Sequence, residues 1–362
     1  MSRPVDVSVV TSGHDVADAR LHRLCGALVR RGLEVEVLGL GDASGGPEGV
    51  FLTTTARSGF ASRAVLAVRY SAQARGQVLL TLDPDALVAA RVVGGLRGRR
   101  VVADVHEDYA RLLQDRDWPR GVTALGARVV VAAAMHAART SALTLVSDDH
   151  VPPLQARRRL VLRNEADSQL VGGPTPHGNV PRACYVGDVR PSRGLFTMLE
   201  AVAATPPWTL DVVGPVRVRD HAAIERRCAA SDLAGRVRWH GRKPPARAWS
   251  LVEGSWVGFA LLDDTPAFRD ALPSKVYEYL AKGILPIVSD LPRQRALVAE
   301  IGAGVIVQDA ESAASALRNY ALDPKRRATE CRAALSWARQ RESEGSPYDR
   351  AAECVEAVLR HG

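Results

Sequence analysis

Aromatic residues are scarce in this sequence, where Phe, Trp and Tyr together make up 5% of 362 residues. Proteins whose main task is to stack on nucleobases or on long glycans need aromatic platforms. The scarcity therefore counts against a protein of that kind, and we expect no nucleic-acid partner.

Cysteine is sparse as well, with five residues that lie far apart in the chain. None forms a CxxC pair, and none has a histidine at the spacing of a zinc site. We therefore expect no metal site, and a reducing compartment fits this usage best. The five are Cys25, Cys184, Cys228, Cys331 and Cys354.

Long apolar runs are missing too. The longest, Val129 to Met135, falls far short of the roughly 18 to 20 residues that a membrane-spanning helix needs. The N-terminus has no charged segment followed by an apolar one, because a strand pattern begins at Val5. We expect a cytoplasmic protein that is soluble or, at most, peripheral to the inner membrane face.

Lysine is nearly absent, although the net charge is +8. It occurs only at Lys243, Lys275, Lys282 and Lys325, so almost all of the positive charge is arginine. A GC-rich genome explains such a bias, and arginine also suits bidentate binding of phosphate and carboxylate. The clusters at Arg97, Arg99 and Arg100 and at Arg157 to Arg159 have two interpretations, a solvated face or contact with an anionic lipid or acceptor.

What is present is a regular alternation of strands and helices in the first half. A buried strand is followed by a turn at Thr11 to Gly13, an amphipathic helix that ends at Gly32 and a second strand. This order is typical of the start of a doubly wound α/β sheet. The predicted strands are Val5–Val10, Val35–Leu40, Val78–Leu82, Val101–Val105, Leu143–Val146 and Leu160–Leu162.

Residues 165–182 are rich in Gly, Pro and polar residues, which predicts a linker, and the alternation then restarts. We predict two Rossmann-like domains, 1–165 and 183–345, with a cleft between the carboxyl ends of their sheets. A C-terminal helix at about 346–362 would pack back on the first domain. The second domain would have strands at Cys184–Val186, Leu210–Val213, Val237–Trp239, Val257–Leu261 and Leu285–Val288, with helices at Leu195–Ala203, through Ile224 and at Ser274–Ala281.

The segment from Asp270 to Gly283 has the residue types that a nucleotide diphosphate needs. Ser274 is a suitable N-cap. Lys275 puts a cation in the first turn, where it opposes the helix dipole and lowers stability unless an anion binds there. Glu278 lies one turn later and could accept hydrogen bonds from a ribose diol. The plainer interpretation is an amphipathic helix with a surface Lys–Glu pair.

A second candidate segment is the turn from Gly187 to Gly194, which joins a predicted strand to a helix. Parallel sheets bind their ligands at such turns. Arg193 stands at the helix entrance and is the strongest single candidate for a phosphate contact, whereas Arg190 could be merely exposed.

These runs resemble retaining glycosyltransferase family 4, whose members have the GT-B fold. In the second half the resemblance rests on YVGDVRPSRG at 185–194, WHG at 239–241, LPSKVYEYLAKG at 272–283 and Ser289-Asp290. In the first half it rests on HDVADAR at 14–20, DVHEDY at 104–109 and RNEAD at 163–167. The resemblance extends from about residue 5 to residue 310.

The resemblance implies a role for each residue of the second domain that matches the family's motifs. Arg193 would contact the donor diphosphate, and Glu278 the donor ribose. Asp270 replaces the first glutamate of the family's signature and would contact the transferred sugar. Arg190 would substitute for a basic residue that many members have where this chain has Asp188. The implied donor-binding set is Gly187, Arg190, Arg193, Gly241, Arg242, Ser274, Lys275 and Glu278, with Gly241 and Arg242 beside the nucleobase.

In the first domain, His106 matches the histidine that reaches the transferred sugar near the acceptor. We therefore expect His106, Arg193, Lys275 and Asp270 to be the catalytic set. The acceptor side would be lined by His14, Asp15, Asp18, Arg20 and Glu107. Two plainer interpretations stay open: His106 bonded to strand-end backbone, and Asp15 and Asp18 as helix caps.

The activity that follows is transfer of a sugar from a nucleotide-diphosphate sugar to an acceptor hydroxyl, with UDP favoured over GDP. No carboxylate pair for double displacement stands out, so we expect retention by attack on the face that the phosphate leaves. The acceptor would be a sugar, a cyclitol or a lipid-linked molecule in bacterial glycan, glycolipid or natural-product biosynthesis. No tightly bound cofactor is expected.

Two alternatives stay open on the sequence. One is a sugar-nucleotide epimerase of the same fold, and the other is a non-catalytic protein that binds a nucleotide sugar. A nicotinamide oxidoreductase would need GxGxxG after the first strand, and Thr11-Ser12-Gly13-His14 does not provide it.

Overall fold

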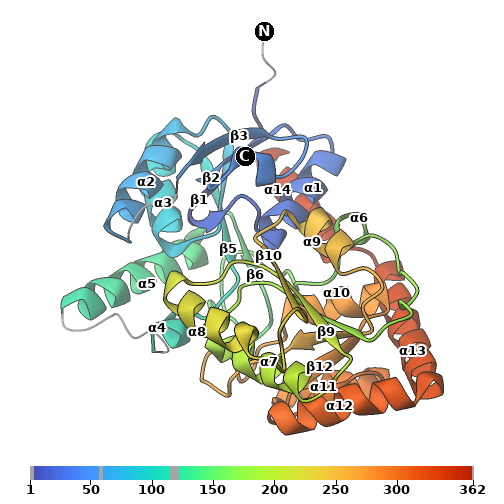
Figure 1. Cartoon of the computed structure of the whole chain (residues 1–362). Coiled ribbons are helices and arrows are strands. Elements are labelled where there is room, and N and C mark those ends of the chain that lie inside the picture. Colours follow the sequence, from blue (N-terminus) through green and yellow to red (C-terminus); the bar gives the residue numbers. More distant parts are fainter. Residues whose placement is uncertain (1–3, 57–59, 115–121, 361–362) are drawn as a thin grey trace. The chain divides into compact units, whose positions relative to one another are not determined.

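A computed structural model describes residues 4–56, 60–114 and 122–360, which form two compact units (Figure 1). The first unit comprises residues 1–164 and 345–362, and the second comprises residues 165–344. Residues 1–3 of the predicted first domain and 361–362 of its returning helix lie outside the described part. The segment 165–182, predicted as a linker, belongs to the second unit and contains a short helix, α6 (Ser168–Val171).

The first unit is built on a seven-stranded sheet in which all neighbouring strands are parallel, in the order β3-β2-β1-β4-β5-β6-β7. The strands are β1 (Val7–Asp15), β2 (Val35–Leu40), β3 (Phe51–Thr55), β4 (Val78–Thr81), β5 (Arg100–Val105), β6 (Leu143–Val146) and β7 (Arg159–Val161). The helices are α1 (Ala19–Arg30), α2 (Phe60–Gln73), α3 (Pro84–Leu96), α4 (Tyr109–Gln114), α5 (Val122–Thr140) and α14 (Pro347–Arg360), with a 3-10 turn η1 (Ala43–Gly45).

Alternation along the strands divides the core of the first unit into two layers. Val78 and Leu80 of β4 point into one layer, and Leu79 between them points into the other. One layer contains apolar residues of α1 and α14, so the C-terminal helix packs beside α1 in this unit. The other layer contains apolar residues of α2, α3 and α5. Helices therefore cover both faces, as buried parallel strands require.

The second unit repeats this topology in a six-stranded parallel sheet of order β10-β9-β8-β11-β12-β13. The strands are β8 (Arg182–Val186), β9 (Thr209–Val213), β10 (Val237–Gly241), β11 (Val257–Ala260), β12 (Leu285–Ser289) and β13 (Val305–Val307). The helices are α7 (Leu195–Ala203), α8 (Val218–Ala229), α9 (Pro245–Leu251), α10 (Ser274–Lys282), α11 (Pro292–Ile301), α12 (Ala310–Leu322) and α13 (Pro324–Ser343), with a 3-10 turn η2 (Pro191–Arg193).

The predicted turn at Thr11 to Gly13 is wrong, because β1 continues through it to Asp15. The register against β2 shifts between Val10 and Asp15, so the strand contains a bulge where the sequence suggests a turn. The cause is tertiary. Asp83, which follows β4, accepts hydrogen bonds from this stretch and keeps it extended.

The strand order places the candidate residues. In each sheet the chain reverses its direction of winding between two adjacent strands, β1 and β4 in the first unit and β8 and β11 in the second. Ligands of open α/β sheets bind beyond the carboxyl ends of the strands at this switch point. Within the described residues, no helix is both long enough and apolar enough to span a bilayer.

Candidate functional site

Two glycines shape the carboxyl edge of the second sheet. Gly187 follows β8 with φ 136°, and Gly214 follows β9 with φ 151°. A Cβ on Gly214 would lie 1.7 Å from the carbonyl oxygen of Gly187, so only glycine permits this backbone contact. The two loops therefore lie against each other at the ends of β8 and β9.

Arg193 stands on the first of these loops, in the 3-10 turn η2 before α7. Gly194, the N-cap of α7, has φ 73°, and a Cβ there would meet the Leu261 side chain at 2.4 Å. The glycine thus lets η2 pack tightly on the chain after β11. Arg193 Nε is buried and has no hydrogen-bond partner among the described residues, and its guanidinium lies 5.8 Å from the Phe268 ring centroid. A buried guanidinium N–H without an acceptor is the kind of group that an anionic ligand satisfies.

Lys275 approaches the same loop from the first turn of α10. It is 7% exposed, and its Nζ lies 3.7 Å from the centroid of the Tyr185 ring. The Nζ atom is also close to the Gly187 backbone, since a Cβ on that glycine would lie 3.1 Å from it. Burial, together with the nearby positive charge of Arg193, holds the pKa of Lys275 well below its ordinary value.

The predicted capping role of Ser274 is wrong. Pro273 is the N-cap of α10, with extended backbone angles of −61° and 136°, and Ser274 is already the first helical residue. Because Ser274 has entered the helix, its hydroxyl no longer occupies the position from which a cap bonds the N2 or N3 amide. No side chain caps α10, and in general the first amide groups of a helix lack intrahelical acceptors.

The other residues predicted for the donor side differ in how deeply they are buried. Glu278 is buried at 5% exposure, one turn after Lys275 on α10. Asp270 is half-buried, and its carbonyl oxygen accepts a hydrogen bond from Arg293 at 3.1 Å. Arg190 forms an ion pair with Asp188, so part of its charge is already balanced. At the end of β10, the Gly241 carbonyl accepts from the Gly214 amide at 2.9 Å and Arg242 is exposed.

Asp83 is the residue that organises the carboxyl edge of the first sheet, and we did not predict it. It is 4% exposed and accepts hydrogen bonds from Thr11 Oγ1 at 2.5 Å and from the Ser12 and Gly13 amides at 2.9 and 3.1 Å. Its Oδ1 lies 2.9 Å from His14 Nδ1. The sequence contained a signal for this role: Asp83 comes directly after the predicted strand Val78–Leu82, and ligands bind at the carboxyl ends of such strands.

His14, near the end of β1, and His106, directly after β5, lie together. Their ring centroids are 4.9 Å apart, and the rings meet edge to face. Burial disfavours the charged form of both rings, but Asp83 outweighs it at His14 and raises the pKa to about 9. At His106, burial and then the charge of His14 lower the pKa. One imidazolium and one neutral imidazole therefore stand side by side near neutral pH.

The remaining acceptor-side candidates are largely occupied by protein contacts. Arg20 is 6% exposed and makes two hydrogen bonds of 2.6 Å to the Asp104 carboxylate and one of 2.6 Å to Asn164. Asp18 is the N-cap of α1, and Asp15 accepts from the Ala17 amide at 3.0 Å, so both have local backbone roles.

Glu107 is half-buried beside His106.

Most of the residues predicted from the sequence thus lie in two groups, one near the switch point of each sheet. Lys275, Arg193 and Glu278 belong to the second unit, whereas His14 and His106 belong to the first.

Comparison with known proteins agrees with this architecture. Residues 174–334, nearly all of the second unit, match the model of the family described as glycosyl transferases group 1. Curated protein sequences give no match. The structure of HepE from Anabaena in complex with UDP aligns with a TM-score of 0.69 and 13% identity, covering 98% of this chain and 100% of that one.

Two further solved structures are similar along their whole length. Sucrose-phosphate synthase from Thermosynechococcus elongatus has a TM-score of 0.66 and 15% identity, over 98% of this chain and 95% of that one. WaaG, a glycosyltransferase involved in lipopolysaccharide biosynthesis, has a TM-score of 0.65 and 15% identity, over 96% and 99%. At such identities the likeness establishes the fold alone. The chain has the GT-B fold of two Rossmann-like α/β domains, as predicted.

Proposed function

We propose that this protein is a glycosyltransferase that moves a sugar from a nucleotide-diphosphate sugar to an acceptor hydroxyl. The observation that carries the proposal is a pair of neighbouring cations at the switch point of the second sheet: the half-buried Arg193, whose buried Nε has no acceptor among the described residues, and the buried Lys275, which lies beside the backbone of Gly187. Two like charges held together under poor solvation are stabilised when an anion binds between them. The match of residues 174–334 to the group 1 family supports the same assignment.

The chemistry follows from that arrangement. Breaking the bond between the sugar and the diphosphate leaves negative charge on the departing phosphate. Arg193 and Lys275, with the amide groups at the start of α10, are positioned to stabilise that charge as it develops. Glu278 would accept from the ribose hydroxyls, and Asp270 would contact the sugar ring. We propose attack from the face that the phosphate leaves, with the phosphate taking the acceptor proton and the configuration retained.

In the first unit, His106 would orient the transferred sugar, and the imidazolium of His14 would bind an electron-rich part of the acceptor. We propose UDP as the nucleotide in preference to GDP, because structures of the similarly folded HepE contain UDP, and UDP-glucose. The acceptor class, a sugar, cyclitol or lipid-linked molecule in bacterial glycan, glycolipid or natural-product biosynthesis, is proposed on the resemblance alone. We also propose, on the same ground, a cytoplasmic location with peripheral contact to the inner membrane face.

Donor binding is the first test. Purified protein is screened against UDP- and GDP-sugars by thermal shift, and the Kd of the best donor is measured by calorimetry. We expect Arg193→Ala and Glu278→Gln each to weaken binding about tenfold or more, since each removes a charge-assisted contact. Arg332→Ala, which removes an exposed arginine of α13, is the matched control. Unchanged affinity in both site variants would overturn the donor site.

Turnover is the second test, and it separates the alternatives. The donor is incubated with pools of candidate acceptors, and products are identified by mass spectrometry and NMR. A glycosyltransferase yields free nucleoside diphosphate and an acceptor that is heavier by one sugar. Conversion of the donor sugar without acceptor would show an epimerase instead, and tight binding without any product would show a non-catalytic binding protein.

A further inference from the structure

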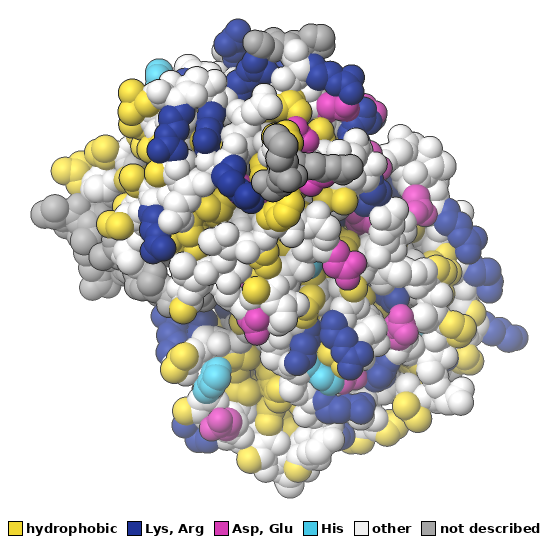
Figure 2. Space-filling model, turned by 90° about the horizontal axis from the view of Figure 1, so that it is seen from above, with side chains coloured by type: hydrophobic (Ala, Val, Ile, Leu, Met, Phe, Trp, Pro, Cys, Tyr) yellow, Lys and Arg dark blue, Asp and Glu magenta, His cyan; other side chains and the backbone are white. Residues whose placement is uncertain are grey.

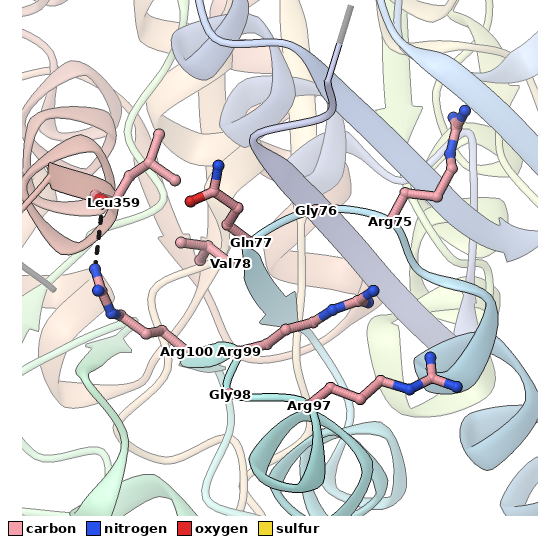
Figure 3. Close-up of a pocket in the computed structure, with 9 residues that line it drawn as sticks. All are labelled: Arg75, Gly76, Gln77, Val78, Arg97, Gly98, Arg99, Arg100 and Leu359. Atoms are coloured by element: carbon pink, nitrogen blue, oxygen red, sulfur yellow. Dashed lines mark hydrogen bonds between the residues drawn. The ribbon is translucent and has the colours of Figure 1, made fainter.

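A second concentration of positive charge lies at the amino-terminal edge of the first sheet. The face of the molecule in Figure 2 shows many Lys and Arg side chains, with apolar side chains among them. A cavity of about 240 Å³ in the first unit is lined by Arg75, Gly76, Gln77, Val78, Arg97, Gly98, Arg99, Arg100 and Leu359 (Figure 3). Val78 and Arg100 begin β4 and β5, whereas Asp83 and His106 follow the same two strands at their carboxyl ends. The cavity is therefore separate from the switch-point site of this unit.

The lining contains four arginines and no acidic residue. Arg75 is paired with Glu36 at 2.7 Å. The other three donate to backbone carbonyls instead: Arg97 to Ala72, Arg99 to Ala74, and Arg100 to Val358 and Leu359. Within the described part of the chain these three form no ion pair, and all of these hydrogen bonds use the Nη1 atom. The Nε and Nη2 groups remain available to an external acceptor.

Helix capping accounts for only part of this charge. The carbonyl groups that Arg97, Arg99 and Arg100 contact lie at the carboxyl ends of α2 and α14. Each helix end carries roughly half a negative elementary charge, so the two ends offset about one of the three guanidinium charges. About two positive charges are left over in one small cavity.

The excess is concentrated on Arg97 and Arg99, whose side chains run side by side in the same direction in Figure 3. Burial, and then the neighbouring charge of Arg97, lower the pKa of Arg99. Two guanidinium groups held together in this way match the oxygens of a phosphate group, which arginine binds through paired hydrogen bonds.

We propose that this cavity is a binding site for a phosphate group, with Arg97 and Arg99 as its principal ligands and Arg100 and Gln77 at its border. Two exposed apolar side chains stand in the last turns of α3, the helix whose C-cap is Arg97: Val92 is 60% exposed and Leu96 is 85% exposed. The phosphate belongs either to a soluble molecule or to the headgroup of an anionic lipid, and in the second case Val92 and Leu96 contact the acyl boundary. The site does not depend on the proposed donor site.

The test uses the full chain and two probes. In solution, inorganic pyrophosphate is titrated into an Arg193→Ala Lys275→Ala background, which removes diphosphate binding at the proposed donor site. On membranes, co-sedimentation is measured with phosphatidylcholine vesicles that contain or lack phosphatidylglycerol. We expect binding to pyrophosphate, to the anionic vesicles or to both, weakened about tenfold or more by Arg97→Gln Arg99→Gln.

The control is Arg69→Gln, which removes an exposed arginine from α2 in the same unit, and it should leave binding unchanged. Arg97→Lys Arg99→Lys keeps the charge that caps the helices, so it tests the guanidinium geometry if the glutamine variant is unstable. Loss of vesicle binding in Leu96→Ser with pyrophosphate binding intact would assign the site to a lipid headgroup. Binding to neither probe, equal binding to neutral vesicles, or an equal loss in Arg69→Gln would overturn the proposal.

Discussion

The Nδ1 atom of His14 lies 2.9 Å from the Oδ1 atom of Asp83, although 69 positions separate the two residues in the sequence. The contact joins the end of β1 to a residue two positions after β4, and the first sheet reverses its winding between these two strands. It keeps His14 protonated at neutral pH and fixes its ring beside His106. The imidazole of His14 is therefore charged because the strand order of the sheet brings Asp83 next to it.

The ion pair predicts a pH dependence of stability. His14 has a pKa of about 9 in the folded protein against an ordinary value of 6.5, so between these values the native state binds more protons than the unfolded state. The free energy of unfolding contributed by His14 is therefore fully present below about pH 6.5 and is lost as the pH rises through 9. We expect urea denaturation to show this decline.

This loss of stability between about pH 6.5 and pH 9 should be smaller in Asp83→Asn, because the pKa of His14 falls when its partner is lost. Asp85→Asn removes a nearby carboxylate that accepts from Ser12 and Arg63 instead, and it should keep the decline. An identical slope in Asp83→Asn and the unmodified chain would show that this pair does not set the pH dependence.

Replacing Lys275 by methionine should move stability and nucleotide binding in opposite directions. The buried ammonium is poorly solvated and lies near Arg193, so an apolar side chain of similar length should leave the free energy of unfolding unchanged or raise it by about 1 kcal/mol. Affinity for the nucleotide diphosphate should fall about tenfold or more. Urea denaturation and calorimetry measure the two effects. Lys325→Met, at an exposed position of α13, should change neither.

The bidentate pair of Arg20 and Asp104 should be among the strongest single contacts in the first unit. Removing one partner leaves the other buried without compensation, and Arg20→Ala should cost about 3–5 kcal/mol in urea denaturation. Arg30→Ala breaks an exposed pair with Asp349 and should cost less than about 1 kcal/mol. Equal losses in the two variants would contradict a structural role for Arg20.

Gly214→Ala should damage the proposed donor site through the backbone. The new Cβ would overlap the carbonyl of Gly187, so the loop that carries Arg193 must move. We expect nucleotide affinity to fall, with stability reduced by more than about 1–2 kcal/mol. Gly302→Ala is the matched control, because Gly302 has φ 68° but nothing within 4 Å of its added Cβ. It should cost only the backbone strain and leave nucleotide affinity unchanged.

Local patterns were enough to propose most of the second unit's candidate site. Hydrophobic runs bounded by Gly187 and Gly214 mark the ends of β8 and β9. Arg193 and Lys275 stand next to predicted helix starts, and Glu278 lies one turn after Lys275. These features depend on neighbours within a few residues, so the sequence displays them directly. The predicted capping role of Ser274 was wrong, since Pro273 already supplies the extended residue before α10.

The sequence by itself therefore determined the two α/β domains, the GT-B fold and the segments that carry Arg193, Lys275 and Glu278. Only the tertiary structure decided which side chains meet. It turned the expected turn at Thr11 into a bulged strand, placed Asp83 under His14 and buried Arg20 against Asp104. The reason is physical: hydrophobic periodicity records which face of an element is buried, whereas a contact between residues 69 or 84 positions apart depends on the strand order that folding selects.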